Sequence, residues 1–314
     1  MGFKQVAVIV GLTAVVLQLI PSLFRESLPN VVKGYAAPGW ESVADVFKRH
    51  VEEGLEQGGA VAVWHRGDLV VEYWGGYADI EAQRPWTKET VTCLFSATKG
   101  VTATVAAILV DRGLVQYDTP IATYWPEFAQ NGKEKISLRQ ILSHTAGLAA
   151  IDEPLTVQDI TENPKKVSEA LAAQKPLWGP GTDHGYHGLT LGLYVDQIVR
   201  RVDPQGRDIS QFFREEVAEP FEIDMFIGLP LEENHRCARM YKPALWSMFT
   251  TRSWSVLQMF LAMILNSNSE TARMISNPSG FTADRANDPT VRASLAVPPG
   301  VSVRQLGSPN FTAS

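Results

Sequence analysis

Cysteine is scarce in this chain of 314 residues, and that scarcity excludes several classes of protein. Cys93 and Cys237 are too few to form the disulfide framework of a small secreted domain. Neither lies in a C-x-x-C pair or in a cluster of cysteine and histidine that could hold zinc. A chain of this length can bury a core large enough to stabilise itself. We therefore expect no structural metal, no metal in the functional site and no cofactor.

Positive charge is not in excess, and this argues against one class of partner. The chain has 28 lysine and arginine residues against 34 aspartate and glutamate residues, a formal net charge of −6. It contains no run of basic residues that could follow a phosphate backbone. Nucleic acid is therefore disfavoured as a partner. With 45% hydrophobic and 20% charged residues, the composition is that of a globular protein and excludes a disordered chain.

One long apolar run occupies residues 6–24, between Lys4 and Arg25. The run is just long enough to cross a bilayer. The small residues that signal-peptide cleavage needs are missing directly after it. We therefore expect an uncleaved membrane anchor within residues 1–27 and a membrane-anchored or secreted protein. A cleaved signal peptide and a buried helix remain the alternatives.

The next segments predict a linker followed by a mixed α/β unit. Residues 28–39 are rich in proline and glycine and are expected to form the linker, with the folded domain over 40–314. Apolar residues at intervals of three and four predict an amphipathic helix over 41–57. Two apolar runs, 60–64 and 69–74, flank a turn in which Gly67 can adopt a positive φ, which predicts a β-hairpin.

Beyond the hairpin the pattern is helical. Apolar residues recur at intervals of three and four over 101–109, and Gly113 is placed to end this helix. Ser96 is therefore expected in or near the first turn. Further helical runs alternate with loops rich in proline and glycine; examples are residues 138–142, 191–201 and 210–218. We expect a helical insertion over about 119–260.

The four residues Ser96-Ala97-Thr98-Lys99 form an S-x-x-K motif at the start of this helix. Residues three apart share a helix face, so the Lys99 amine can reach the Ser96 hydroxyl group. A serine hydroxyl is a poor nucleophile until a neighbouring group takes its proton, and an amine can assist in this. The Ser96 backbone N–H is available to stabilise an oxyanion. Alone, the motif is a weak signal, because a solvated lysine beside a capping serine produces the same pattern.

Further motifs follow in a fixed order. They are Leu94–Gly100 around Ser96, Asp118–Ile121 with Tyr124–Phe128, Leu142–Leu148, and the glycine-rich run Gly179–Gly192 that carries Tyr186 after a Pro-Gly turn. Together these residues resemble the landmarks of the serine β-lactamase-like family. That family includes class C β-lactamases, penicillin-binding proteins, esterases and animal β-lactamase-domain proteins. The resemblance covers roughly residues 39–230.

This resemblance implies a fold and a mechanism. The fold is α/β plus all-α, an antiparallel sheet with flanking helices and an inserted helical domain, as in β-lactamases and transpeptidases. Ser96 would be the nucleophile that accepts the acyl group, Lys99 its activating partner and Tyr186 the phenol that moves the proton. The positive charge of Lys99 would lower the pKa of Tyr186 from its ordinary value near 10. The function implied is hydrolysis of an ester or amide, and the partner a small-molecule or peptide-like acyl substrate.

Two departures from the family pattern stand out. Gly188 occupies the position where many members carry an asparagine that orients the lysine, and His187 is the candidate to replace that amide in binding at the site. His144 is expected in a structural turn, not in a triad with Ser143. After Tyr186 the chain has no triplet of the K-T-G, H-T-G or H-G-G type, so we expect the closing strands and the second oxyanion donor to be missing.

Two functions from different classes follow. The first is a serine hydrolase that works through an acyl-enzyme, and the second is a truncated or non-catalytic family member that acts as a binding or assembly module. The trio of Ser96, Lys99 and Tyr186 favours the first, and the missing triplet favours the second. The enzyme hypothesis requires the three polar groups to meet, with the nearest pairs within about 3–4 Å. It also requires Ser96 to face the space between the α/β part and the helical part.

Overall fold

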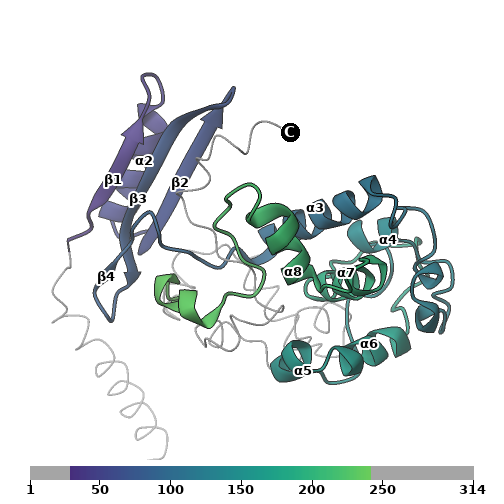
Figure 1. Cartoon of the computed structure of the whole chain (residues 1–314). Coiled ribbons are helices and arrows are strands. Elements are labelled where there is room, and N and C mark those ends of the chain that lie inside the picture. The colour runs from purple at the N-terminus through teal and green to yellow at the C-terminus, as the bar shows by residue number, and fades with distance from the viewer. Residues whose placement is uncertain (1–28, 242–314) are drawn as a thin grey trace, which may run out of the picture.

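The computed structural model describes residues 29–241, which form an antiparallel sheet and a group of helices (Figure 1). The strands are β1 (Val32–Ala36), β2 (Gly58–His65), β3 (Asp68–Asp79) and β4 (Arg84–Pro85). Their order is β1-β3-β2, and β4 pairs with the end of β3. The predicted anchor at 6–24 lies outside the described residues. Within residues 29–241, none of the helices has the length and the apolar composition that crossing a bilayer requires.

The predicted hairpin is confirmed as β2 and β3. Arg66 and Gly67 have φ angles of 52° and 90°, and two positive φ angles are the mark of the tight turns that suit a twisted hairpin. The pairing places Val61 opposite Tyr73 and Val63 opposite Val71. These pairs lie on the sheet face that receives helix α2.

The predicted linker over 28–39 is partly wrong, because residues 32–36 form strand β1 along β3. Gly34, which favoured a linker in the sequence, is instead required by the pairing. A Cβ atom at this position would lie 2.1 Å from the Glu72 carbonyl oxygen, so no larger residue fits there. The glycine allows the two backbones to approach closely at the edge of the sheet.

Helix α2 (Glu41–Glu52) covers one face of the sheet (Figure 1). Ala44 is fully buried against Val71 and Tyr73. The neighbours that complete this apolar cluster are Val32, Ala36, Trp40, Phe47, Val61 and Val63. The helix ends before the predicted residue 57, because Gly54 adopts a φ of 70° directly after it, as glycine does at many helix ends.

The remaining helices lie on the other side of the molecule (Figure 1). They are α3 (Thr98–Asp111), α4 (Leu138–Leu142), α5 (Val157–Glu162), α6 (Pro164–Ala173), α7 (Thr190–Val202) and α8 (Ile209–Phe213). Short turns of other helix types join them: η1 (Phe95–Ala97), η2 (Ile121–Thr123), η3 (Pro126–Phe128), the π-helix η4 (Arg214–Ala218) and η5 (Leu231–Arg236). Trp125, Phe128 and Tyr194 are fully buried in one aromatic cluster at the centre of this part. The helical runs predicted from the sequence are all present.

The chain returns to the sheet after the helices. The backbone N–H of Ala238 donates to the Val91 carbonyl oxygen at 2.8 Å, and that of Arg239 donates to Ala78 at 2.7 Å. The Tyr241 hydroxyl group accepts a hydrogen bond from the Ile80 N–H at 2.9 Å. Both ends of the helical part therefore lie beside the sheet, which is the arrangement of an insertion. The helical part includes α3 and begins at residue 95, whereas the sequence predicts the insertion from about 119, and the chain is back at the sheet by residue 239.

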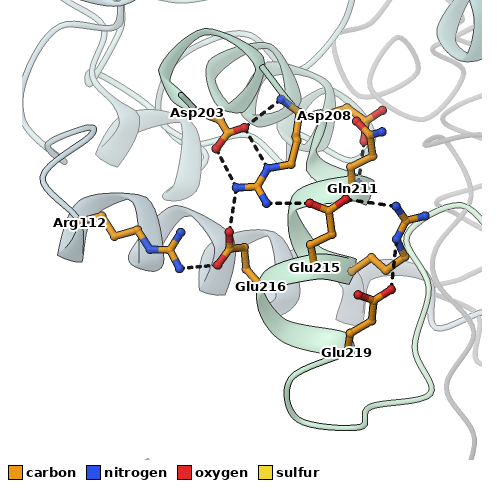
Figure 2. Close-up of polar contacts among 9 residues, drawn as sticks. Arg112, Asp203, Asp208, Gln211, Glu215, Glu216 and Glu219 are labelled. Carbon is orange, nitrogen blue, oxygen red and sulfur yellow. Dashed lines mark hydrogen bonds and ion pairs between the residues drawn. The ribbon is translucent and has the colours of Figure 1, made fainter. Parts of the chain in front are cut away.

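A network of charged residues joins α3 to the segment that follows α7 (Figure 2). Arg207 is 8% exposed, and its guanidinium group bonds to Asp203, Glu215 and Glu216. Arg112, which directly follows α3, reaches the same Glu216 at 2.6 Å. Hydrogen bonds from Arg207 hold the pKa of Asp203 below its ordinary value. The network fixes the π-helix η4 against α3, the helix that begins beside Ser96.

Substituting Arg207 by methionine should lower the free energy of unfolding by about 2–3 kcal/mol. This is less than the 3–5 kcal/mol typical of a fully buried pair, because Glu215 and Glu216 stay partly hydrated. The matched control is Arg214→Met, since Arg214 is more exposed and, among residues 29–241, forms its ion pairs with Glu215 and Glu219. Its loss should be under about 1 kcal/mol in urea denaturation. Equal losses in the two variants would contradict the central place of Arg207.

Candidate active site

Ser96 lies where the chain passes into the helical part, in the turn η1 that leads into α3. This confirms its predicted position at the start of the helix. Its side chain is exposed. The preceding residue, Phe95, has a φ of 48°, in the left-handed region that bulky residues rarely adopt and that costs about 1–3 kcal/mol. Such strain persists only where the surroundings enforce it, so the backbone next to Ser96 is held in a conformation that it would not adopt by itself.

Three polar groups meet at Ser96, as the sequence predicts. The Lys99 amine donates to the Ser96 hydroxyl oxygen at 3.4 Å. The Tyr186 hydroxyl group is hydrogen-bonded to the same oxygen. The Lys99 amine also lies 4.7 Å from the centre of the Tyr186 ring, within range of a cation–π interaction. A hydroxyl, an amine and a phenol therefore converge on one point at the start of α3.

The Lys99 amine is oriented by a backbone carbonyl group. It donates to the Gly188 oxygen at 2.6 Å, a shorter distance than the 3.4 Å to the Ser96 hydroxyl oxygen. This differs from the expectation that His187 takes the place of the missing asparagine. The structure differs from the expectation because the acceptor for Lys99 does not have to be a side chain. The Gly188 backbone already supplies an oxygen within reach of the amine.

The surroundings of Tyr186 favour its ionised form. Burial raises the pKa of the phenol, but hydrogen bonds to Ser96 and Lys99 and the positive charge of Lys99 outweigh it. The pKa of Tyr186 therefore lies below its ordinary value near 10. A phenol whose pKa is lowered in this way is closer to the range in which it can take a proton from a serine hydroxyl group.

The loop that carries Tyr186 is tied to the turn at residues 144–148. The N–H groups of Leu177 and Gly181 donate to the carbonyl oxygens of Gly147 and Thr145, both at 2.8 Å. The N–H of Gly185 donates to the His144 carbonyl oxygen at 3.1 Å. Two motifs that are separate in the sequence therefore form one structural unit behind the site.

Two glycines allow this close packing. At Gly185 a Cβ atom would lie 2.3 Å from the Trp178 ring, and at Gly147 it would lie 2.6 Å from the Trp178 carbonyl oxygen. Any side chain at either position would push the Tyr186 loop away from the turn. The sequence analysis did not single out these glycines, although their place inside two of the motifs is a signal that could have been used.

His187 lies behind Tyr186 and is 0% exposed. Its Nε2 atom accepts the Leu148 N–H at 3.0 Å, and its Nδ1 atom is 2.6 Å from the Gly185 carbonyl oxygen. Both ring nitrogens thus contact the backbone. The sequence suggests that His187 binds at the site. The hydrogen bonds of its ring go to the backbone of Leu148 and Gly185, and neither joins it to Lys99 or Ser96.

His144 is in a structural turn, as expected, with a φ of 63°. Its Nδ1 atom accepts the His187 backbone N–H at 3.0 Å. The hydrogen bond of the neighbouring Ser143 hydroxyl group is to the Thr145 hydroxyl group and not to the His144 imidazole. The contact of His144 with the backbone next to Tyr186 is a feature that the sequence analysis missed.

Within residues 29–241, no group of three or more histidine, cysteine or acidic residues is placed to hold a metal ion. The converging groups suit a different chemistry, in which a hydroxyl group becomes a nucleophile when an adjacent base takes its proton. The expected absence of closing strands concerns residues 242–314, which lie outside the described part.

Comparison with known proteins gives matches over most of this region. The family profile described as Beta-lactamase matches residues 43–278. The esterase/beta-lactamase LipL of Mycobacterium tuberculosis is 39% identical over 202 residues, which cover 63% of this chain and 46% of LipL. A beta-lactamase of Escherichia coli is 29% identical over 213 residues, covering 66% of this chain and 54% of the relative. The chain thus spans about half the length of these curated relatives.

A solved structure shares the fold. The crystal structure of a family VIII carboxylesterase superposes with a TM-score of 0.71 at 34% identity, over 87% of this chain and 68% of the other. The fold of the chain is therefore that of β-lactamases and transpeptidases, with an antiparallel sheet and helices. The profile match covers most of the chain and includes Ser96, Lys99 and Tyr186. This protein belongs to the β-lactamase family.

Proposed function

We propose that this chain carries the acyl-enzyme centre of a serine hydrolase that acts on esters or amides. The observation that carries the proposal is the convergence of the Ser96 hydroxyl group with the Lys99 amine and the Tyr186 phenol. A hydroxyl group with two proton-transfer partners is the arrangement that nucleophilic catalysis needs. If Ser96 were only an exposed serine beside a structural lysine, its hydroxyl group would not need the Tyr186 phenol as a second partner.

In the first half of the reaction, the phenolate form of Tyr186 takes the proton of Ser96 as the Ser96 oxygen attacks the acyl carbon. Lys99 stabilises the negative charge of this phenolate until the proton has moved. The bond to the alcohol or amine leaving group then breaks, and the leaving group takes the proton from Tyr186. The product at this stage is an ester between Ser96 and the acyl group. The Ser96 backbone N–H is the proposed donor to the oxyanion.

In the second half, Tyr186 takes a proton from a water molecule that attacks the acylated Ser96. The acyl–oxygen bond breaks, and the proton passes from Tyr186 to the departing Ser96 oxygen. A carboxylic acid leaves, and the starting state returns. The hydrogen bond from Lys99 to Gly188 keeps the amine in place through both halves.

The names of the relatives support esters and β-lactam amides as the substrate classes. LipL is named as an esterase and a beta-lactamase, and a further relative from Burkholderia gladioli is named as an esterase. The exposed surface beside Ser96 supports an apolar acyl group. Phe95 and Tyr186 are 46% and 45% exposed, so two aromatic rings border the nucleophile. A short-chain ester is therefore the first substrate to test.

Substituting Ser96 by alanine should lower the rate of hydrolysis of a chromogenic short-chain ester by at least about 100-fold. The substitution removes the atom that forms the acyl-enzyme. The matched control is Ser143→Ala, because this serine lies outside the trio and bonds to Thr145. Its rate should stay within about twofold of the unsubstituted chain. Equal rates for the unsubstituted chain and Ser96→Ala would favour the non-catalytic module instead.

Substituting Lys99 by methionine should raise the pKa of Tyr186 measurably. A nearby cation favours the charged phenolate, so its removal favours the neutral phenol. The pKa can be followed by NMR of tyrosine ring carbons, with Tyr186→Phe to assign the signal. The control is Lys165→Met, because this lysine is an exposed residue of α6 that pairs with Glu169. An unchanged pKa in Lys99→Met would show that the lysine does not assist the phenol.

A further inference from the structure

The backbone on both sides of Tyr186 is held by imidazole groups. On one side, the His187 N–H donates to Nδ1 of His144 at 3.0 Å. On the other, the Gly185 carbonyl oxygen lies 2.6 Å from Nδ1 of His187. The same His187 ring accepts the Leu148 N–H through Nε2 at 3.0 Å. The residue that contacts Ser96 is thus tied through its two neighbours to the turn at 144–148.

These contacts require both imidazoles to be neutral. A ring nitrogen that accepts a backbone N–H must keep its lone pair. In His187 the proton therefore sits on Nδ1, where it is donated to Gly185, and Nε2 stays unprotonated. In His144 the proton sits on Nε2. Adding a second proton to His187 would place an N–H group against the Leu148 N–H and break the hydrogen bond.

The surroundings resist a positive charge on either ring. The His187 ring is fully buried, with the Trp178 ring 6.0 Å away and the His144 ring 5.5 Å away. The groups that face His144 are His184, whose ring is 5.9 Å away, Tyr186 at 5.0 Å, and the charge of Lys99 from α3. On the same loop, Asp183 accepts the backbone N–H of His184.

These neighbours change the titration of both histidines. Burial lowers the pKa of His187 to about 4, with the contact to Gly185 opposing this and the charges of His144 and His184 adding to it. Burial and the charges of Lys99 and His184 also lower the pKa of His144. Protonation of either ring therefore competes with the folded arrangement.

We propose that His144 and His187 are positioning residues, an imidazole clamp that holds Tyr186 against Ser96 only while both rings are neutral. The proposal rests on the proposed function of the trio and adds to it an acid-sensitive support. Neither histidine contacts the reacting atoms through the hydrogen bonds described. Each acts through the backbone that flanks Tyr186.

The sign of the pH dependence follows from the two states of the clamp. When the clamp is open, His187 has the ordinary histidine pKa of about 6.5. When the clamp is closed, the pKa of His187 is about 4. The opened form therefore holds more protons between these values, and the closed form loses stability as the pH falls. The clamp is fully formed above about pH 6.5 and is lost as the pH falls through about 4.

The first test is amide hydrogen exchange of Leu148, followed by NMR in the full chain. Between pH 7 and pH 5, its protection factor should fall about twentyfold, because the opened clamp takes up a proton that the closed clamp excludes. In His187→Gln the amide oxygen can accept the same N–H and does not titrate, so only His144 can still take up a proton and the protection factor should fall by much less than twentyfold. The control is His235→Gln, since His235 is an exposed residue of η5. This control should behave as the unsubstituted chain does.

Equal protection of Leu148 at pH 7 and pH 5 in the unsubstituted chain would overturn the proposal. The same twentyfold loss in His187→Gln would also overturn it. The Leu193 amide, in the middle of α7, reports whether the whole fold opens instead. Its protection should not change over this range.

The second test connects the clamp to catalysis at pH 7. His187→Phe removes the acceptor and should lower kcat by more than about tenfold with KM within threefold, whereas His187→Gln should keep kcat within about threefold. A kcat that is unchanged in His187→Phe would overturn the positioning role. If His187→Phe does not fold, the exchange result in His187→Gln decides the matter. Activity that does not depend on Ser96, together with the expected exchange data, would overturn the proposed function but leave the clamp in place.

Discussion

The contact between the start of α3 and the loop that follows residue 176 is the constraint on which the site depends. Ser96 and Tyr186 are 90 residues apart in sequence, and their hydroxyl groups are hydrogen-bonded. Lys99 joins the same two segments through the Gly188 carbonyl oxygen. The helical core supports one side of this contact, because α3 and α7 contribute to the same buried apolar cluster. The turn at 144–148 supports the other.

The site combines exposed reacting groups with a rigid support. The Ser96 and Tyr186 side chains are open to solvent, as access by a substrate requires. The backbone behind them is held by two imidazoles that accept backbone N–H groups. Gly147 and Gly185 allow the close packing of this region, and Phe95 keeps a disfavoured φ beside Ser96. Preorganisation of this kind lets proton transfer occur without first rearranging the chain.

Patterns within short stretches of sequence predicted the features that depend on interactions between neighbouring residues. Apolar periodicity located helix α4 at its observed residues, because a buried helix face repeats every three or four positions. The three-residue spacing predicted that Ser96 and Lys99 lie on one face of a helix. The family resemblance identified Tyr186, which lies 90 residues after Ser96 in the sequence. Strand β1 was missed because glycine, which is typical of linkers, here allows a close backbone approach. The roles of the Gly188 carbonyl group and of His144 could not be predicted, since backbone contacts between distant segments leave no pattern in the sequence.

The most direct test of the account is labelling by an alkyl fluorophosphonate, which reacts with activated serine hydroxyl groups. The full chain is incubated with the reagent at pH 7.5, digested and mapped by mass spectrometry. The account predicts one adduct per chain, on the peptide that contains Ser96, and a much slower reaction in Lys99→Met and Tyr186→Phe. A chain that stays unlabelled, or one labelled equally at several surface serines, would contradict the claim that these three residues form an acyl-enzyme centre.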